Sequence, residues 1–149
     1  MNIAIIPARG GSKRIPRKNI KEFCGKPMIC YSIDAAKKSG VFDKIIVSTD
    51  DDEIANIAKD CGAEVPFMRP KYLSDDNVAT TPVIIHAIKQ IENLIGSIDN
   101  VCCIYATAPF IHSNDLRKGL DLLIEKNCSF VFTVTTFPYP IQRALKIVE

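Results

Sequence analysis

The sequence has few residues that could hold a metal and no run long enough to cross a membrane. It contains only two histidines, His86 and His112, and its six cysteines form no C-x-x-C pair, so we predict no zinc site and expect free core thiols. No apolar run approaches the roughly 20 residues of a membrane span. The first residues lack the charged region and the length of a signal peptide. We therefore predict a cytoplasmic protein, where unpaired thiols are the rule.

The net charge is also small, but it is unevenly distributed. The formal charge of the 149 residues is +2. Residues 9–26 carry seven basic side chains against one acid, Glu22, so this stretch carries +6 and the rest of the chain −4. A local excess of this kind indicates one anionic ligand, and it argues against nucleic-acid or membrane partners.

Apolar runs of strand length alternate with segments of helical periodicity. Both faces of the strand-like runs are apolar, which predicts an α/β fold with a mainly parallel sheet covered by helices on both faces. No repeat, low-complexity linker or second domain boundary occurs, so residues 1–149 are expected to form one domain. Strands are predicted at 2–7, 44–49, 64–68 (the weakest), 101–106 and 130–135, and helices at about 27–40, 51–61, 81–95 and 113–126.

Boundary residues support these helices. Pro27 and Gly40 bracket the first helix. Asp51 or Asp52 is expected to cap the second and Thr81 the third. Ligands of such sheets bind at the carboxyl ends of the strands, which points to the loops at 8–26, 48–53, 69–82, 106–114 and 135–143.

The strongest functional signal is the stretch IIPARGGSKRIPRKN near the start of the chain. Gly10 and Gly11 let backbone N–H groups converge on phosphate oxygens. Arg9 can hold a phosphate through two hydrogen bonds, and Lys13 and Lys18 add point charges. Neither the Walker A pattern nor G-x-G-x-x-G fits, because the glycines are adjacent and a proline follows. The loop suits a triphosphate, with a solvated basic loop as the alternative.

From Ala8 to Asn19 this stretch matches every defined position of A-R-G-G-S-K-x-I-P-x-K-N, and it thereby resembles the acylneuraminate cytidylyltransferases. The resemblance continues through IIVSTDD, the Arg69-Pro70 pair with the following LSDD, and the helix after Pro82. It implies a Rossmann-like nucleotidyltransferase fold. It also implies an enzyme that joins CMP from CTP to the anomeric hydroxyl of a nonulosonic acid, a nine-carbon sugar acid, and releases pyrophosphate.

The resemblance assigns the residues of the basic loop to the triphosphate. Arg9 and Lys18 are expected to contact the phosphates and to be the catalytic groups, with Lys13 at the rim. Asn19 is expected to fix the exit of the loop. The neighbouring positions that would complete the nucleotide site, mainly through backbone N–H groups, are Ala8, Gly10, Gly11 and Ser12.

A second group is expected around the nucleoside. The resemblance implies that Arg69 lies near the cytosine, and that Asp76, Asn77 and Thr80 lie near the base or ribose. A surface salt bridge is the alternative for Arg69, and helix capping is the alternative for Asn77 and Thr80. The role of Asp50, at the end of the second strand, stays open.

After the fourth strand the sequence departs from the sialic acid enzymes. Tyr105 stands in place of a glutamine that contacts the sugar, and Ile111 in place of an arginine. These changes, the string YATAPF and the later FPYPIQRA resemble the pseudaminic acid branch. Substrate contacts are expected from Tyr105, Thr107, Gln142 and Arg143, since an arginine can pair with the carboxylate of the sugar.

Family members are longer than this sequence, which is therefore expected to be a fragment. Mg²⁺ is the implied cofactor, but no carboxylate pair here matches the family's metal motif, so no metal ligand is assigned. The full-length protein is expected to be a homodimer. Other acceptors, namely N-acetylneuraminate, Kdo or a sugar 1-phosphate, stay open. So does a catalytically inactive nucleotide-binding module, and the isolated fragment is expected to bind CTP weakly without forming a CMP-sugar.

Overall fold

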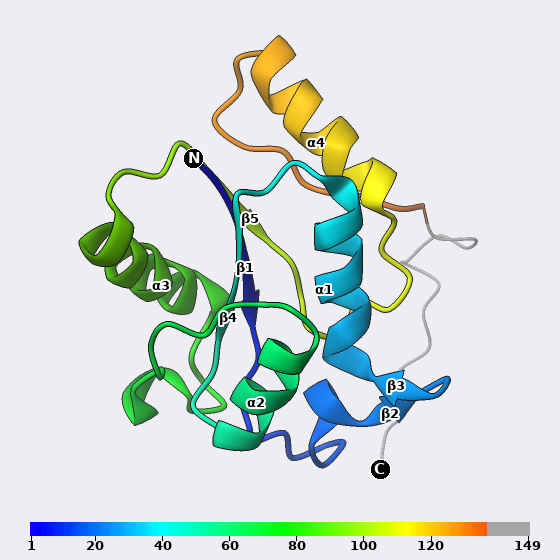
Figure 1. The fold of residues 1–149 in the computed structure, drawn as a ribbon, viewed down its shortest axis with the longest axis vertical. Coiled ribbons are helices and arrows are strands. Elements are labelled where there is room, and N and C mark those ends of the chain that lie inside the picture. The colour runs from blue at the N-terminus through cyan, green and yellow to red at the C-terminus, as the bar shows by residue number, and fades with distance from the viewer. Residues whose placement is uncertain (137–149) are drawn as a thin grey trace, which may run out of the picture.

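A computed structural model of the chain describes residues 1–136 (Figure 1). Strands and helices alternate along the chain as the sequence predicts. The elements are β1 (Asn2–Pro7), η1 (Lys18–Ile20), β2 (Glu22–Phe23), β3 (Lys26–Pro27), α1 (Met28–Ser39), β4 (Lys44–Ser48), α2 (Asp52–Asp60), η2 (Lys71–Leu73), α3 (Thr80–Ile95), β5 (Asn100–Cys103) and α4 (Ser113–Glu125).

The central sheet is parallel, as predicted, and β1 lies in its middle. The strand order is β4-β1-β5, and Ile5 of β1 is paired with Ile46 on one side and Cys103 on the other. Residues 3–6 of β1 are fully buried, because neighbours cover both edges and both faces of this strand. The three strands run downward in Figure 1, so that their carboxyl ends point toward the loop after β1 in the lower part of the picture.

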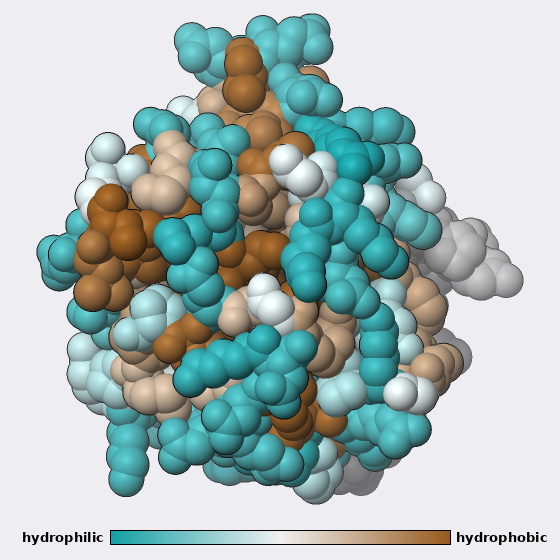
Figure 2. Space-filling view, viewed as in Figure 1, coloured by the Kyte–Doolittle hydropathy of each residue, from teal (hydrophilic) through white to brown (hydrophobic). Residues whose placement is uncertain are grey.

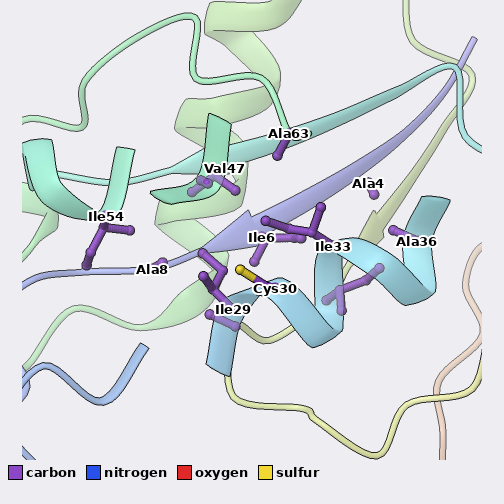
Figure 3. Packing of buried hydrophobic residues seen from close by; sticks show 13 residues of the cluster. Ala4, Ile6, Ala8, Ile29, Cys30, Ile33, Ala36, Val47, Ile54 and Ala63 are labelled. Carbon is purple, nitrogen blue, oxygen red and sulfur yellow. The ribbon is translucent and has the colours of Figure 1, made fainter. Parts of the chain in front are cut away.

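Helices cover both faces of the sheet, which confirms the predicted α/β architecture. Side chains alternate along a strand, so Ala4 and Ile6 face one side while Ile3 and Ile5 face the other. The first pair packs with residues of α1 and α2, as Figure 3 shows. The second pair packs with Ala87 and Ile91 of α3.

Two predicted strands differ from the structure. Residues 64–68 contribute only isolated bridges, Ile46 to Glu64 and Thr49 to Met68. Residues 130–135 form no strand, and Phe130, Phe132 and Val134 are 70–80% exposed. A strand that is apolar on both faces needs a paired neighbour and a covering layer, and the described residues supply neither for this segment.

The helix ends mostly follow the predicted boundaries. Gly40 ends α1 in the left-handed conformation with φ 67°, which glycine adopts without a steric penalty. Asp51 caps α2, its Oδ1 accepting from the Ile54 N–H at 3.0 Å. The expected cap at Thr81 is wrong, because α3 begins at Thr80 and Ala79 at its N-cap makes no side-chain hydrogen bond.

The expectation of free core thiols is wrong for most of the cysteines. Cys30 in the first turn of α1 and Cys61 after α2 form a disulfide, with their Cα atoms 5.6 Å apart. This pairing was missed because the two residues lie 31 positions apart and meet only when α1 and α2 pack on the same face of the sheet. The unpaired cysteines are largely outside the core: Cys102 is half-buried, whereas Cys24, Cys103 and Cys128 are exposed.

The outer surface carries apolar groups on two helices. Figure 2 shows brown residues gathered over α3, and this helix exposes Ile85, Leu94 and Ile95. The helix α4 buries no residue completely and is tied to the end of α1 by Arg117, whose Nε donates to the Ser39 carbonyl at 2.6 Å.

Of the helices described, none is both long and apolar enough to span a membrane.

Candidate active site

A cavity of about 310 Å³ lies at the carboxyl edge of the sheet. Three segments far apart in the sequence form its walls: the loop after β1, the segment from residue 69 to the start of α3, and the residues after β5. Nine of the predicted site residues line it, namely Arg9, Ser12, Lys13, Lys18, Arg69, Asp76, Thr80, Tyr105 and Thr107. The sequence therefore identified most of the polar groups that the fold brings together here.

Residues 8–20 form the basic loop after β1, called the phosphate loop below, and hydrogen bonds hold both of its ends. The Ala8 N–H donates to the Ser48 carbonyl at 3.0 Å, so Ala8 continues the sheet and lies in the core rather than in the cavity. Asn19 is 7% exposed, and its Nδ2 donates to the Arg9 carbonyl at 2.8 Å. Asn19 thus joins the two ends of the loop, as predicted.

Of the expected backbone donors, Gly11 N–H is the one that has no acceptor within residues 1–136. The Gly10 N–H donates to Asp50 Oδ1 at 3.1 Å, and the Ser12 N–H donates to the Gly10 carbonyl at 2.9 Å. Among the described hydrogen bonds, none is donated by Gly11 N–H. The anion-binding nest that the two glycines suggested is therefore not assembled in this conformation.

Asp50 and Arg69 form the buried support beneath this loop. The side chain of Arg69 is 3% exposed, and its Nη2 lies 3.6 Å from Asp50 Oδ1. Its Nε donates to Ser74 Oγ at 3.1 Å, whereas Nη2 makes no hydrogen bond to any of the residues that the structure describes. Burial lowers the pKa of Arg69, and Asp50 opposes that shift. Arg69 thus forms a salt bridge, as the alternative expected, but a buried one rather than one at the surface, and the residue lines the cavity.

Asp76 closes an ion-pair bridge at the front of the cavity. Its Oδ1 lies 2.7 Å from Arg9 Nη2, and its Oδ2 lies 2.5 Å from Lys13 Nζ. The hydrogen bond from Lys13 is the largest cause that lowers the pKa of Asp76. The carboxylate therefore faces the cations of the phosphate loop.

Arg17 and Asp51 form a clamp that secures the middle of the loop, and the sequence analysis missed it. Arg17 adopts φ 55° and binds Asp51 through two hydrogen bonds of 2.5 and 2.8 Å, and it also pairs with Glu53. The bond from Arg17 lowers the pKa of Asp51. The one signal for this clamp was the acidic run after the second strand, opposite in charge to the basic loop.

Tyr105 lies at the rim on the opposite wall. Its hydroxyl is 3.5 Å from Thr80 Oγ1, and its carbonyl accepts from the buried Ser32 Oγ at 2.8 Å. Tyr105 is 59% exposed, so Ser32 fixes its backbone while the side chain stays accessible. Ile111, by contrast, packs against the core. Asn77 does not line the cavity, and Gln142 and Arg143 lie outside the described residues.

A basic loop lies at the carboxyl edge of the sheet, with a buried arginine behind it and a polar rim, and this arrangement suits an anionic ligand. Residues 3–140 match the family model described as cytidylyltransferase. The chain belongs to the cytidylyltransferase family.

Relatives with curated names agree with this family. The chain is 49% identical over 148 residues to the pseudaminic acid cytidylyltransferase of Campylobacter jejuni, which covers 99% of this chain and 64% of that protein. It is 35% identical to the CMP-N,N'-diacetyllegionaminic acid synthase of Legionella pneumophila over 80% of this chain and 52% of that one. The chain thus spans less than two thirds of the length of these relatives.

Solved structures of the family share the fold. A CMP:2-keto-3-deoxy-manno-octonic acid synthetase complexed with CTP superposes with a TM-score of 0.72 at 23% identity, over 85% of this chain and 48% of that one. A cytidylyltransferase from Leptospira borgpetersenii gives 0.67 at 25% identity, over 83% and 49% of the two chains. The Rossmann-like nucleotidyltransferase fold is therefore confirmed.

The carboxylates that line this cavity or lie behind it are not arranged as the metal site that the family implies. Of the two described carboxylates in the lining, Asp76 is held between two cations and Asp75 accepts from the Asn77 N–H. Asp50, behind the cavity, accepts from Gly10 and faces Arg69. Within residues 1–136, no group of three or more His, Cys, Asp or Glu side chains is arranged to hold a metal ion. Mg²⁺ stays a prediction, and no step is assigned to it here.

Proposed function

We propose that the protein containing this chain transfers CMP from CTP to the anomeric hydroxyl of a nonulosonic acid, with pseudaminic acid as the preferred acceptor. The hydroxyl oxygen would attack the α-phosphorus, the bond to the bridging oxygen would break, and pyrophosphate would leave as the hydroxyl loses its proton. The observation that carries this proposal is the basic loop at the carboxyl edge of a cytidylyltransferase fold.

The chain's own groups suit the charge of this reaction. Little covalent chemistry is required of the protein in phosphoryl transfer, so positioning and charge neutralisation supply most of the rate. Arg9 and Lys18 would neutralise the triphosphate and the leaving pyrophosphate. Lys13, whose side chain is 84% exposed, would act at the rim. Nη2 of Arg69, which faces Asp50 but makes no hydrogen bond to residues 1–136, would donate to a carbonyl of the base, since a buried donor favours a ligand that satisfies it.

The acceptor is proposed from the sugar side of the cavity. The 49% identity to a pseudaminic acid cytidylyltransferase supports this choice. So does Tyr105, whose phenol replaces the amide of a glutamine on the accessible wall. The match to a diacetyllegionaminic acid synthase keeps other nonulosonic acids as the second candidate. A homodimer and a cytoplasmic location stay predictions.

The deciding experiment supplies the full-length protein with CTP, Mg²⁺ and one acceptor at a time. Acceptors are pseudaminic acid, N-acetylneuraminic acid and Kdo, and products are identified by mass spectrometry. We expect CMP-pseudaminic acid with the highest kcat/KM. An equal or reversed order of kcat/KM among the acceptors would reject pseudaminic acid as the preferred acceptor but leave the proposed cytidylyltransferase activity intact. CTP binding without any product would indicate a nucleotide-binding module.

A further inference from the structure

Asp76 holds two of the cations that the proposed function assigns to phosphate. One carboxylate oxygen is 2.7 Å from Arg9 Nη2 and the other is 2.5 Å from Lys13 Nζ. All three side chains line the cavity. The contact joins the phosphate loop to the segment before α3, which is more than sixty residues away in the sequence.

We propose that Asp76 is a displaceable counter-ion, which occupies the place of a phosphate in the ligand-free protein and leaves when a polyphosphate binds. This inference rests on the proposed function, because it takes the ligand to be a nucleoside triphosphate or pyrophosphate. It adds a role for Asp76 that contact with the base or ribose does not include.

Competition follows from the chemistry of the two anions. Carboxylate and phosphate each offer arginine a pair of acceptor oxygens in the same geometry. Arg9 Nη2 and Lys13 Nζ already make contacts of hydrogen-bond length with Asp76, so a phosphate must share or replace them. A phosphate placed beside an ionised carboxylate would also be repelled. Replacement is therefore the favoured outcome.

The contact is weak enough to be replaced. The side chains of Arg9 and Asp76 are about 30% exposed and that of Lys13 is 84% exposed, and partly solvated ion pairs stabilise a fold little. Residues 74–79 belong to no helix or strand, so the carboxylate can turn away without disturbing the sheet. In the Asp50–Arg69 pair the arginine is only 3% exposed and the carboxylate 22%, so this pair keeps the support in place.

Such a counter-ion discriminates by charge. A ligand gains from displacing Asp76 only if it brings more negative charge than the carboxylate it replaces, which favours a triphosphate or pyrophosphate over an uncharged nucleoside. The same carboxylate returns to Arg9 and Lys13 when the anion leaves, so it also assists release.

The test compares Asp76→Asn with the unchanged sequence, both in the full-length protein, by calorimetry against CTP, pyrophosphate and cytidine, in buffer without divalent metal. We expect the Kd values for CTP and pyrophosphate to fall about fivefold, because two weak ion pairs no longer compete. The Kd for cytidine should not change. Asp121→Asn on the exposed side of α4 removes the same charge outside the cavity and should leave all three Kd values unaltered. Melting curves confirm that both variants fold.

The other outcomes overturn the inference in distinguishable ways. Unchanged or weaker CTP binding by Asp76→Asn, with normal binding by the unchanged chain, rejects the counter-ion role alone. If cytidine binding weakens in parallel, Asp76 contacts the nucleoside directly. If no form of the full-length protein binds CTP or pyrophosphate, the proposed function fails and the counter-ion role fails with it.

Discussion

Replacing Gly10 with alanine should damage the phosphate loop, whereas the same change at Gly11 should not. A Cβ built on Gly10 would lie 2.5 Å from Asp51 Oδ2 and 3.0 Å from its Cβ, while a Cβ on Gly11 meets nothing within 4 Å. The two glycines are adjacent, and alanine at either position restricts the backbone of the unfolded chain to the same extent. The pair of variants therefore isolates the steric effect.

The clash at Gly10 cannot be relieved cheaply. Asp51 caps α2 through the Ile54 N–H and binds Arg17 through both oxygens, so any rotation of its side chain breaks several contacts. Shifting the loop instead would stretch the bond from the Gly10 N–H to Asp50. Overpacking of this kind costs about 1–3 kcal/mol, which corresponds to a fall in melting temperature of roughly 2–12 °C.

Differential scanning calorimetry measures the stability of both variants, and titration with CTP measures their binding. Gly10→Ala should melt earlier and bind CTP more weakly, because the loop cannot keep its place under the phosphates. Gly11→Ala should match the unchanged chain in melting temperature. Equal melting temperatures for all three chains, or equal losses in the two variants, would refute the steric reasoning.

Three further changes test other contacts. Arg9→Ala should weaken CTP binding about 10- to 150-fold in calorimetry, because a hydrogen bond to a charged group contributes about 1.5–3 kcal/mol; unchanged affinity would contradict the assignment. Cys30→Ser with Cys61→Ser should lower the free energy of unfolding in urea by about 3–4 kcal/mol relative to the oxidised chain, and reduction of the unchanged chain should have the same effect. Arg17 holds the pKa of Asp51 below its ordinary value, so ionised Asp51 stabilises the fold at neutral pH and this contribution is lost as the pH falls through the folded-state pKa. The melting temperature of Asp51→Asn should therefore lie below that of the unchanged chain at pH 7, and the two should converge only in acid, below the ordinary carboxyl pKa of about 3.9.

Local sequence signals were sufficient where one residue decides the structure. Gly40 ends α1 because its left-handed conformation is accessible to glycine, and Asp51 begins α2 because its carboxylate can satisfy a free N–H. The apolar run of β1 predicted a strand buried on both faces, and the structure confirms it. The signature of the basic loop likewise located Arg9 and Lys18 at the cavity.

Contacts between distant segments could not be derived in the same way. The clamp of Arg17 and Asp51 and the bridge of Asp76 depend on how three loops meet at one edge of the sheet. The residues at 130–135 have the composition of a strand, but strand formation requires a neighbour, and composition does not specify one. The disulfide was missed for the same reason, since its two cysteines come together only in the folded chain.

The position of β1 in the sheet has a consequence for how the chain folds. This strand is made first, yet its two neighbours are β4 and β5, which end about 40 and 100 residues later. At roughly 5–20 residues per second, its second edge waits about 5–20 s during synthesis before a partner exists. Throughout that interval an apolar strand with an unpaired edge is open to wrong pairing. Early docking of α1 against Ala4 and Ile6 would shield one face of the nascent strand. Residues 1–40 alone could therefore reduce wrong pairing before β4 and β5 are made.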